Sequence, residues 1–290
     1  MDKRKVCIIF NPGARGDKAR LLEAELREFA GEMPIFASSE PSSIEALALE
    51  AVKNGYDHII AAGGDGTVNA VVNGVAGMDV TLSILPLGTM NVFAYELGIR
   101  ATQLRKCWEM IQAGQPKTVD LALASQRYFV QLAGVGLDAL TVQETDWHMR
   151  KAIGPVSYVF AAAQVIGRPA PVLQLEFADG SEHSGSFVLI GNGRFYGGPI
   201  ALFRDAKNDD GLLDVLVFRH QTYLDILRYL QGILIGTHVD LPDIEYRQTS
   251  WLRVLSNRVV PVELDGDVAE STPLEFRIAR EQLRVVGVGG

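Results

Sequence analysis

The chain has 290 residues, 48% of them hydrophobic, and its 27 Lys and Arg against 35 Asp and Glu give a formal net charge of −8. This length fits one or two globular domains with enough apolar residues for buried cores. The negative charge argues against nucleic-acid binding through general electrostatic attraction, so we expect no nucleic-acid partner.

The N-terminus and the cysteines bear on the compartment. Two cysteines in unrelated contexts, Cys7 and Cys107, support neither a disulfide framework nor a zinc cluster, which favours a reducing compartment. The apolar run at 6–10 is too short for a signal peptide, and no stretch of about 18 uncharged apolar residues occurs. We therefore expect a soluble cytoplasmic protein.

The first part of the chain alternates predicted strands with predicted helices, which indicates a mostly parallel sheet with helices on its faces. Strands are expected at 5–10, 57–62 and 82–88, and helices at about 17–31, 41–55, 67–75 and 89–97. Ligands gather at the carboxyl ends of such strands. Three Gly- or Pro-rich loops fall there, at 11–16, 63–67 and 86–91, and we expect them to line one cleft.

After about residue 115 the pattern changes to short apolar strands with two helical stretches, typical of a β-rich domain. We therefore predict an α/β plus β fold, with an α/β domain at 1–125 and a β-rich domain at 126–290. The extreme C-terminal segment can belong to the first domain instead of the second.

The sequence GGDGT at 63–67 suggests nucleotide phosphate chemistry. Gly63, Gly64 and Gly66 would let successive N–H groups converge on phosphate oxygens, and a helix starting near Thr67 would add its positive end. A tight turn that needs glycine for steric reasons alone is the alternative. Asp65 favours the first interpretation, because an acid in an anion site needs a compensating cation such as the Mg²⁺ of a nucleotide.

Two familiar nucleotide motifs do not explain this loop. The Walker pattern G-x-x-x-x-G-K-[ST] is absent, and Asn69 occupies the place of the third glycine of a dinucleotide fingerprint.

Several segments, in matching order and spacing, resemble the catalytic domains of the diacylglycerol kinase and sphingosine kinase family, most of all its small bacterial members. The segments are FNPGARGDKA at 10–19, GGDGTVN at 63–69, PLGTMNVFA at 86–94, AGVGLDA at 133–139, DDGLLDV at 209–215 and ELDGD at 263–267. The resemblance implies an NAD-kinase-like nucleotide-binding domain and a β-sandwich lipid-substrate domain, with the active cleft between them. It also implies transfer of the γ-phosphoryl group of ATP to a lipid hydroxyl with Mg²⁺.

The resemblance also implies a set of nucleotide contacts, for which ordinary turn and capping work is the alternative. Thr89, for example, could simply cap the following helix, and Lys18, or Arg15 in its place, could be a solvated charge rather than the phosphate-binding cation. The implied contacts are Asn11, Lys18, Gly64, Gly66, Thr67, Gly88, Thr89 and Asn91.

Three acids are implied to be catalytic. Asp65 resembles the family acid that organises Mg²⁺ through water, and Asp120 resembles a second acid of that network; an edge-strand position facing water is the alternative for Asp120. Asp265 matches the general base on the lipid hydroxyl, and a plain Asp-Gly hairpin turn is its alternative.

The segment at 203–215 resembles a calcium loop, but Lys207 sits among the would-be ligands and strands are expected around it, so an EF-hand is disfavoured. In related bacterial kinases this loop holds a structural Mg²⁺. The resemblance implies Asp210 as a side-chain ligand, with the main-chain carbonyls of Lys207 and Leu212. A solvated acidic turn is the alternative.

Some positions depart from the family pattern. Ala70 and Val92 stand where many relatives have a carboxylate, and Asp267 replaces the commoner Glu. A non-catalytic nucleotide- or lipid-binding relative therefore stays an alternative, as does an NAD-kinase-like soluble phosphotransferase. Asp65, Asp120 and Asp265 are all present, which favours activity.

The segment 147–168 has Arg150, Lys151 and Arg168 but no acid, which is typical of contact with an anionic membrane surface. Packing of its apolar face on the second domain is an equal alternative. We expect ATP and a membrane lipid as partners, at the inner membrane face. The stretch at 223–236 is a second candidate for lipid contact, although core packing is favoured there. Neither the acceptor lipid nor the oligomeric state, a homodimer included, follows from the sequence.

Overall fold

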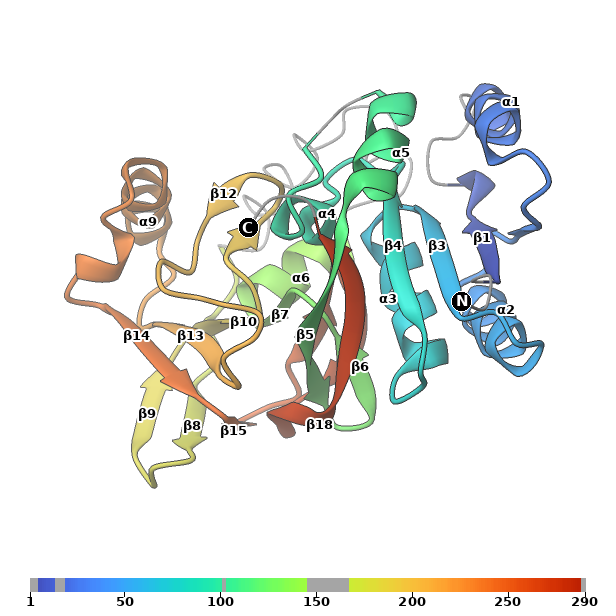
Figure 1. Cartoon of the computed structure of the whole chain (residues 1–290). Coiled ribbons are helices and arrows are strands. Elements are labelled where there is room, and N and C mark those ends of the chain that lie inside the picture. Colours follow the sequence, from blue (N-terminus) through green and yellow to red (C-terminus); the bar gives the residue numbers. More distant parts are fainter. Residues whose placement is uncertain (1–4, 14–18, 101–102, 145–166, 288–290) are drawn as a thin grey trace. The chain divides into compact units, whose positions relative to one another are not determined.

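The computed structural model describes residues 5–13, 19–100, 103–144 and 167–287, which divide into two units (Figure 1). Unit 1 comprises residues 1–121 and 280–290, and unit 2 comprises residues 122–279. The chain crosses from one to the other within strands β5 (Gln115–Ala124) and β18 (Leu274–Gly287). The last residues therefore belong to unit 1 although they follow unit 2 in the sequence.

Unit 1 is built on a parallel sheet. Its strand order is β2 (Ile35–Ala37), β1 (Val6–Phe10), β3 (His58–Gly63) and β4 (Thr81–Pro86). The end of β18 pairs with the other edge of β4 and so extends the sheet. Most residues of β1, β3 and β4 are buried, which requires helices on both faces of the sheet.

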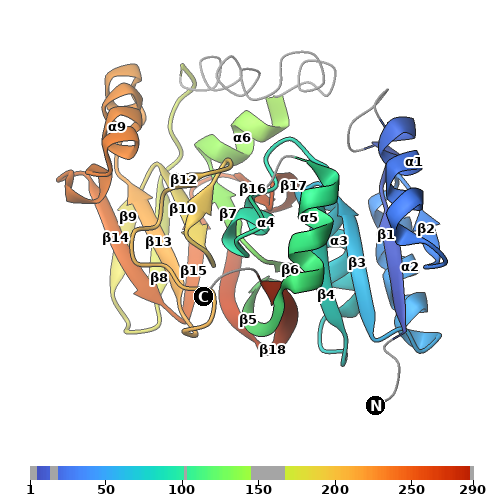
Figure 2. The same ribbon diagram turned by 45° about the horizontal axis from the view of Figure 1, so that its top comes forward.

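Two helix pairs cover the sheet of unit 1. Helix α2 (Pro41–Lys53) packs on α3 (Asp65–Val75) so closely that a Cβ on Gly74 would lie 2.4 Å from the Glu45 carbonyl oxygen. Helix α1 (Ala19–Ala30) packs on α5 (Leu104–Ala113) through the rings of Phe29 and Trp108, 4.9 Å apart. Figure 2 shows α5 in front of the sheet and α3 behind it. A short helix, α4 (Val92–Glu96), follows β4.

Unit 2 is a β-sandwich. Its antiparallel six-stranded sheet has the order β14 (Ile244–Thr249), β13 (Leu213–Phe218), β10 (Phe187–Gly191), β7 (Leu132–Val135), β16 (Pro261–Leu264) and β17 (Asp267–Ser271). The start of β18 lies beside β15 (Trp251–Ser256), β8 (Leu173–Phe177) and β9 (Glu182–Gly185) in a second layer, and β5 also pairs with β6 (Arg127–Phe129).

One apolar core joins the two layers of unit 2. Val188 and Val215 of the first layer pack in the same cluster as Leu252 and Phe276 of the second. Smaller elements complete the unit: β11 (Phe195–Tyr196), β12 (Ile200–Ala201), α6 (Leu137–Glu144), α9 (Tyr223–Ile235) and the 3₁₀ turn His238–Asp240. The α/β plus β fold class predicted from the sequence is confirmed.

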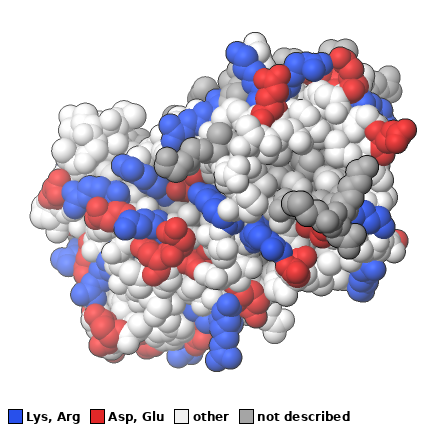
Figure 3. Space-filling model, in the orientation of Figure 1, with Lys and Arg blue, Asp and Glu red and all other residues white. Residues whose placement is uncertain are grey.

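Helix α9 packs on the core with one face only. Its ends are well defined, by a capping box between Thr222 and Asp225 and by Gly236 at a φ of 76°. The core packing expected from the sequence is found where Tyr229 is buried in a core cluster and Ile226 and Ile233 pack against it, whereas the opposite face is exposed. Its exposed large side chains are Tyr223, Leu224, Leu227, Leu230, Leu234 and Ile235, all at least half exposed. The projection that α9 forms is almost entirely uncharged in Figure 3.

Within the described residues, no helix combines the length and the apolar character needed to cross a membrane.

Candidate functional site

The three Gly- or Pro-rich loops of unit 1 start side by side. β1, β3 and β4 are parallel and in register, with Phe10 opposite Ala62 and Gly63 opposite Pro86. Backbone hydrogen bonds continue the register into the loops, from the Asn11 N–H to the Ala62 carbonyl (3.0 Å) and from the Leu87 N–H to the Gly63 carbonyl (2.8 Å). The sheet therefore brings the loops to one edge, as its parallel strands predict.

The Asn11 side chain connects the first loop to the second. Its Nδ2 donates to the hydroxyl of Thr67, 3.0 Å away, and its Oδ1 accepts the Gly13 N–H at 2.8 Å. Thr67 is 3% exposed in the first turn of α3. The two residues thus fix how the first loop lies over the start of α3.

Glycines allow the second and third loops to touch. A Cβ on Gly88 would lie 2.5 Å from the Cα of Gly64, and a Cβ on Gly63 would lie 2.3 Å from the Thr67 hydroxyl oxygen. The first contact is with backbone and the second with the Thr67 side chain, so a side chain at Gly88 or Gly63 would require its neighbour to move. Gly66 lies just after them in the first turn of α3.

Asn91 closes the third loop on itself. Its Oδ1 accepts the Gly88 N–H and its Nδ2 donates to the Gly88 carbonyl, both at 2.8 Å, while its own backbone is left-handed with a φ of 51°. Asn91, rather than Thr89, occupies the N-cap position of α4, so the alternative that Thr89 caps this helix is wrong. Thr89 is exposed at the tip of the loop.

The two predicted catalytic acids of unit 1, Asp65 and Asp120, are held by hydrogen bonds. Asp65 begins α3, and its Oδ1 accepts the Phe93 N–H of α4 at 3.4 Å. Asp120 is 5% exposed on β5, and its Oδ1 accepts from Nε2 of Gln282 on β18 at 2.9 Å. Because Asp120 is buried and bonded, the alternative of an edge position facing water is wrong. Sequence reasoning had not found Gln282.

Among the described residues, no group of three or more His, Cys, Asp or Glu forms a metal site. Asp65 and Asp120 nevertheless offer carboxylate oxygens, which are the ligands that Mg²⁺ prefers, and a nucleotide brings phosphate oxygens of its own. The donor chemistry therefore fits Mg²⁺ bound chiefly to a nucleotide. Lys18 and Arg15, the predicted phosphate cations, lie outside the described residues.

Asp265 of unit 2 is enclosed by backbone amides. Its Oδ2 accepts the Val130 N–H at 2.9 Å, and its Oδ1 accepts those of Gln131 at 2.9 Å and Leu132 at 3.1 Å. The residue is 8% exposed and has a φ of 49° in the turn between β16 and β17. It is therefore more than a plain hairpin residue, because it fixes the start of β7.

The predicted metal loop precedes β13. Asp210 is exposed, and its Oδ1 accepts the Leu212 N–H at 3.1 Å, while Gly211 has a φ of 76°. Beside the loop, burial raises the pKa of Asp214 to about 6, and the negative charges of Asp210 and Asp205 raise it further. Carboxylate and carbonyl oxygens in a negative field suit a hard divalent cation, so the donor set fits Mg²⁺.

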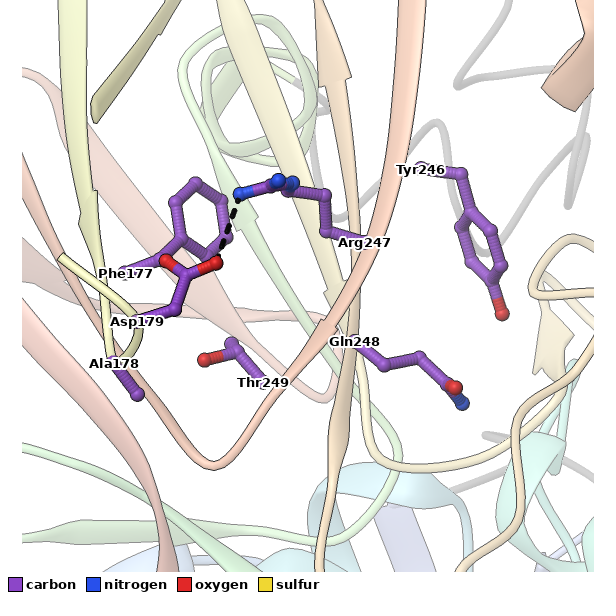
Figure 4. A pocket seen from close by; sticks show the side chains of 7 residues that line it. All are labelled: Phe177, Ala178, Asp179, Tyr246, Arg247, Gln248 and Thr249. Carbon is purple, nitrogen blue, oxygen red and sulfur yellow. Dashed lines mark ion pairs between the residues drawn. The ribbon is translucent and has the colours of Figure 1, made fainter. Parts of the chain in front are cut away.

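A separate polar pocket of about 320 Å³ lies in unit 2 (Figure 4). It contains none of the residues predicted from the sequence. Arg247, its cation, pairs with Asp179 at 3.5 Å and stacks over the Phe177 ring at 5.3 Å from the centroid. Because its charges already compensate one another, we do not consider it a candidate site.

Two further acids of unit 2 were not predicted from the sequence. Glu263 on β16 is 1% exposed, and Asp138 in the first turn of α6 accepts the Tyr196 hydroxyl at 2.6 Å. Burial raises the pKa of both carboxyl groups, and in Glu263 the nearby Asp138 raises it further. The signal that could have identified Glu263 is a glutamate inside the apolar run VVPVELDG.

Two family models match the chain. Residues 5–124 match the diacylglycerol kinase catalytic domain, and residues 131–287 match the YegS C-terminal NAD kinase beta sandwich-like domain. The second match alone spans more than half of the chain.

Similar proteins span nearly the whole chain. A diacylglycerol kinase of Bacillus subtilis is 28% identical, and the match covers 98% of this chain and 96% of that protein. A "Probable lipid kinase YegS-like" protein of Stenotrophomonas maltophilia is 30% identical, and the match covers 93% of this chain and 91% of that protein. The crystal structure of a diacylglycerol kinase from Bacillus anthracis shares the fold, with a TM-score of 0.80 at 24% identity over 99% and 98% of the two chains. The chain therefore belongs to the family of diacylglycerol kinases and YegS-like lipid kinases.

Proposed function

We propose that this protein transfers the γ-phosphoryl group of ATP, with Mg²⁺, to a hydroxyl of a diacylglycerol-like lipid. The observation that carries the proposal is the convergence of three loops at one sheet edge of unit 1, with Asp65 at the start of α3, in a chain of this family.

The loops offer backbone groups to a nucleotide. We assign the phosphates to the N–H groups of Gly64, Gly66 and Thr67, where the positive end of α3 favours anions, with Lys18 as the cation. Asn11 would hold the first loop against Thr67 while the nucleotide binds. Gly88, Thr89 and Asn91 form the remaining side of this nucleotide site.

Asp65 and Asp120 would hold the Mg²⁺ that accompanies ATP, through water. When bound, this ion neutralises charge on the phosphates. The hydrogen bonds from Phe93 and Gln282 orient the two carboxylates before any ligand arrives. Asp210, with the carbonyls of Lys207 and Leu212, would hold a second Mg²⁺ that stabilises the loop before β13.

We propose that Asp265 receives the proton of the acceptor hydroxyl and orients that hydroxyl. Three amide N–H groups already occupy most of the roughly four acceptor positions of a carboxylate, which fixes its direction. Orientation of the nucleophile is the main demand that phosphoryl transfer places on such a residue.

The acceptor lipid would be reached at the inner face of a membrane. The predicted contact segment 147–168 lies mostly outside the described residues, but the uncharged face of α9 supports docking on a bilayer. Six large exposed apolar side chains on one helix of about 20 Å are typical of a helix that lies in the lipid interface.

The test is ³²P transfer from labelled ATP, with Mg²⁺, into mixed micelles of diacylglycerol, a sphingoid base, phosphatidylglycerol or ceramide, and into NAD in a separate reaction. Label in one lipid, lost in Asp65→Asn, would establish the kinase and its acceptor. Label in NAD alone would favour a soluble phosphotransferase. Tight ATP binding with no label in any acceptor would favour a non-catalytic sensor.

A further inference from the structure

Two carboxyl groups meet inside unit 2. Glu263 is the register partner of Gly134 in the pairing of β16 with β7, and Asp138 Oδ2 lies 2.3 Å from where a Cβ on Gly134 would be. Gly134 therefore leaves the space in which Asp138 lies beside Glu263, close enough for its charge to raise the pKa of the Glu263 carboxyl group. Two carboxyl groups this close repel each other when both are ionised, which favours a state in which one of them carries a proton.

The surroundings assign that proton to Glu263. Tyr196 donates its hydroxyl to Asp138 at 2.6 Å, which favours the ionised form of Asp138. No N–H or O–H group of the described residues donates to Oε1 of Glu263. A proton on Oε1 would satisfy this buried atom by donating to Asp138.

The other oxygen of Glu263 holds the turn of Asp265. Oε2 accepts the Gly266 N–H at 2.7 Å, and Gly266 has a φ of 93° directly after Asp265 with its φ of 49°. Both turn residues thus adopt left-handed backbone, which costs about 1 kcal/mol or more for a residue other than glycine. The bond from Gly266 to Glu263 opposes that cost and fixes where the Asp265 side chain begins.

We propose that Glu263 is a positioning residue for Asp265, and that it does this as a neutral acid that keeps its proton at neutral pH and donates it to Asp138. The role of Asp265 rests on the proposed function; the buried proton does not.

Within the part of the chain that the structure describes, few charged or titratable groups lie around the pair. Asp138 and Asp265 act on Glu263, and Tyr196 acts on Asp138. β7 and β10 carry no titratable side chain, and on β17 Asp267 is exposed and Glu270 half-buried. No cation from these elements faces the pair, and burial is the first reason why the pKa of Glu263 lies well above its ordinary value.

The sign of the pH dependence follows. A carboxyl whose folded pKa is raised adds stability that is fully present below its unfolded pKa, about 4.3, and is lost as the pH rises through the folded pKa. The turnover of the wild-type enzyme should fall as the pH rises through the folded pKa of Glu263, because ionised Glu263 would repel Asp138 and release the turn.

The matched variants are Glu263→Gln, Glu263→Ala and, as a control in the same hairpin, Glu270→Gln. A glutamine can donate to Asp138 and accept from Gly266, so Glu263→Gln should keep kcat within about twofold and lose the alkaline fall in turnover and stability. Glu263→Ala should lower kcat by tenfold or more and leave ATP affinity unchanged, because unit 1 is untouched. Glu270→Gln should keep the wild-type pH profile.

Infrared spectroscopy tests the proton without any assay of activity. The wild-type protein at pH 7 should show the C=O band of a protonated carboxyl, and Glu263→Gln should lack it. Absence of the band in the wild type would overturn the proposal even if the enzyme is a kinase. The positioning role would be overturned if Glu263→Ala kept the wild-type kcat. It would also be overturned if Glu263→Gln lost as much kcat as Glu263→Ala. If no acceptor is phosphorylated, the proposed function fails. The infrared band and the pH dependence of stability still test whether Glu263 is protonated at neutral pH.

Discussion

Gly64 and Gly88 lie in close contact, and the two positions differ in how much space they leave for a Cβ atom. A Cβ on Gly88 would meet the Gly64 Cα at 2.5 Å, whereas a Cβ on Gly64 would meet the Gly88 Cα at 3.1 Å. The first distance requires the backbone to move, and the second requires only a shift of a few tenths of an ångström.

We therefore expect Gly88→Ala to lower ATP affinity and to destabilise unit 1 by about 1–3 kcal/mol, the usual cost of overpacking. Gly64→Ala should have a smaller effect on both. Isothermal titration with Mg-ATP and thermal unfolding measure the two quantities. A reversed order of the two variants would show that the loops do not meet in the way described.

Asp265 offers a second test at the scale of one residue. In Asp265→Asn, Oδ1 can still accept the Gln131 and Leu132 N–H groups, but an NH₂ at the place of Oδ2 would face the Val130 N–H, donor against donor. We expect a loss of about 1–3 kcal/mol in unfolding free energy and a fall in kcat of about a hundredfold or more. Near-native turnover in a folded Asp265→Asn protein would remove this residue from the mechanism.

The individual residues show where the sequence was sufficient. Asn11, Thr67 and Asn91 lie in short motifs whose contacts are local or are made at one sheet edge, so spacing and chain order predict that their loops start side by side. Glu263 has its partner, Asp138, on a helix far away in the chain. The alternation of β16 places Glu263 on the face opposite the core residues Val262 and Leu264, and it carries no information on what covers that face.

Helix α9 is the element for which sequence patterns were insufficient. It is apolar on most of its circumference, and such a helix is normally buried. The structure covers only the side with Tyr229 and Gly232. Periodicity gives the composition of each face, but how much neighbouring chain is available to cover a face depends on the tertiary fold.

We expect the double variant Leu227→Glu and Leu234→Glu to reduce sedimentation of the protein with anionic phospholipid vesicles by tenfold or more, since charges in the interface oppose insertion. Val259→Glu, at a residue 78% exposed elsewhere in unit 2, is the matched control. ATP affinity should stay unchanged in both. Equal vesicle binding by all three proteins would contradict docking through α9, and a dimer in solution that the double variant dissociates would assign this face to a second copy.

For the whole molecule, the strand and helix alternation of the first part and the strand-rich second part gave the fold class directly. The alternation does not show which strand completes the first sheet, because β18 joins β4 across the entire length of unit 2 in the sequence. A pairing of such separation leaves no local signal.

Both cysteines report on unit 1. Cys7 and Cys107 are 0% and 1% exposed, and burial raises the pKa of Cys7 to about 12 and also raises that of Cys107. We expect thiol reagents at pH 8 to label neither residue until unit 1 opens. Mg-ATP at a hundred times its Kd should slow labelling about a hundredfold, because it binds only the folded unit. Immediate labelling of the native protein would contradict the buried positions of the two thiols.

The return of the chain to unit 1 in β18 also orders events during synthesis. A ribosome that makes about 5–20 residues per second needs roughly 8–30 s to translate unit 2 after residue 121. During this time β4 exposes the edge that Arg284 and Val285 will later occupy opposite Thr81 and Leu82. The nascent chain therefore carries one unpaired edge of β4 until β18 has been made, so unit 1 is completed only after unit 2 has been translated, although its first strands are made earlier.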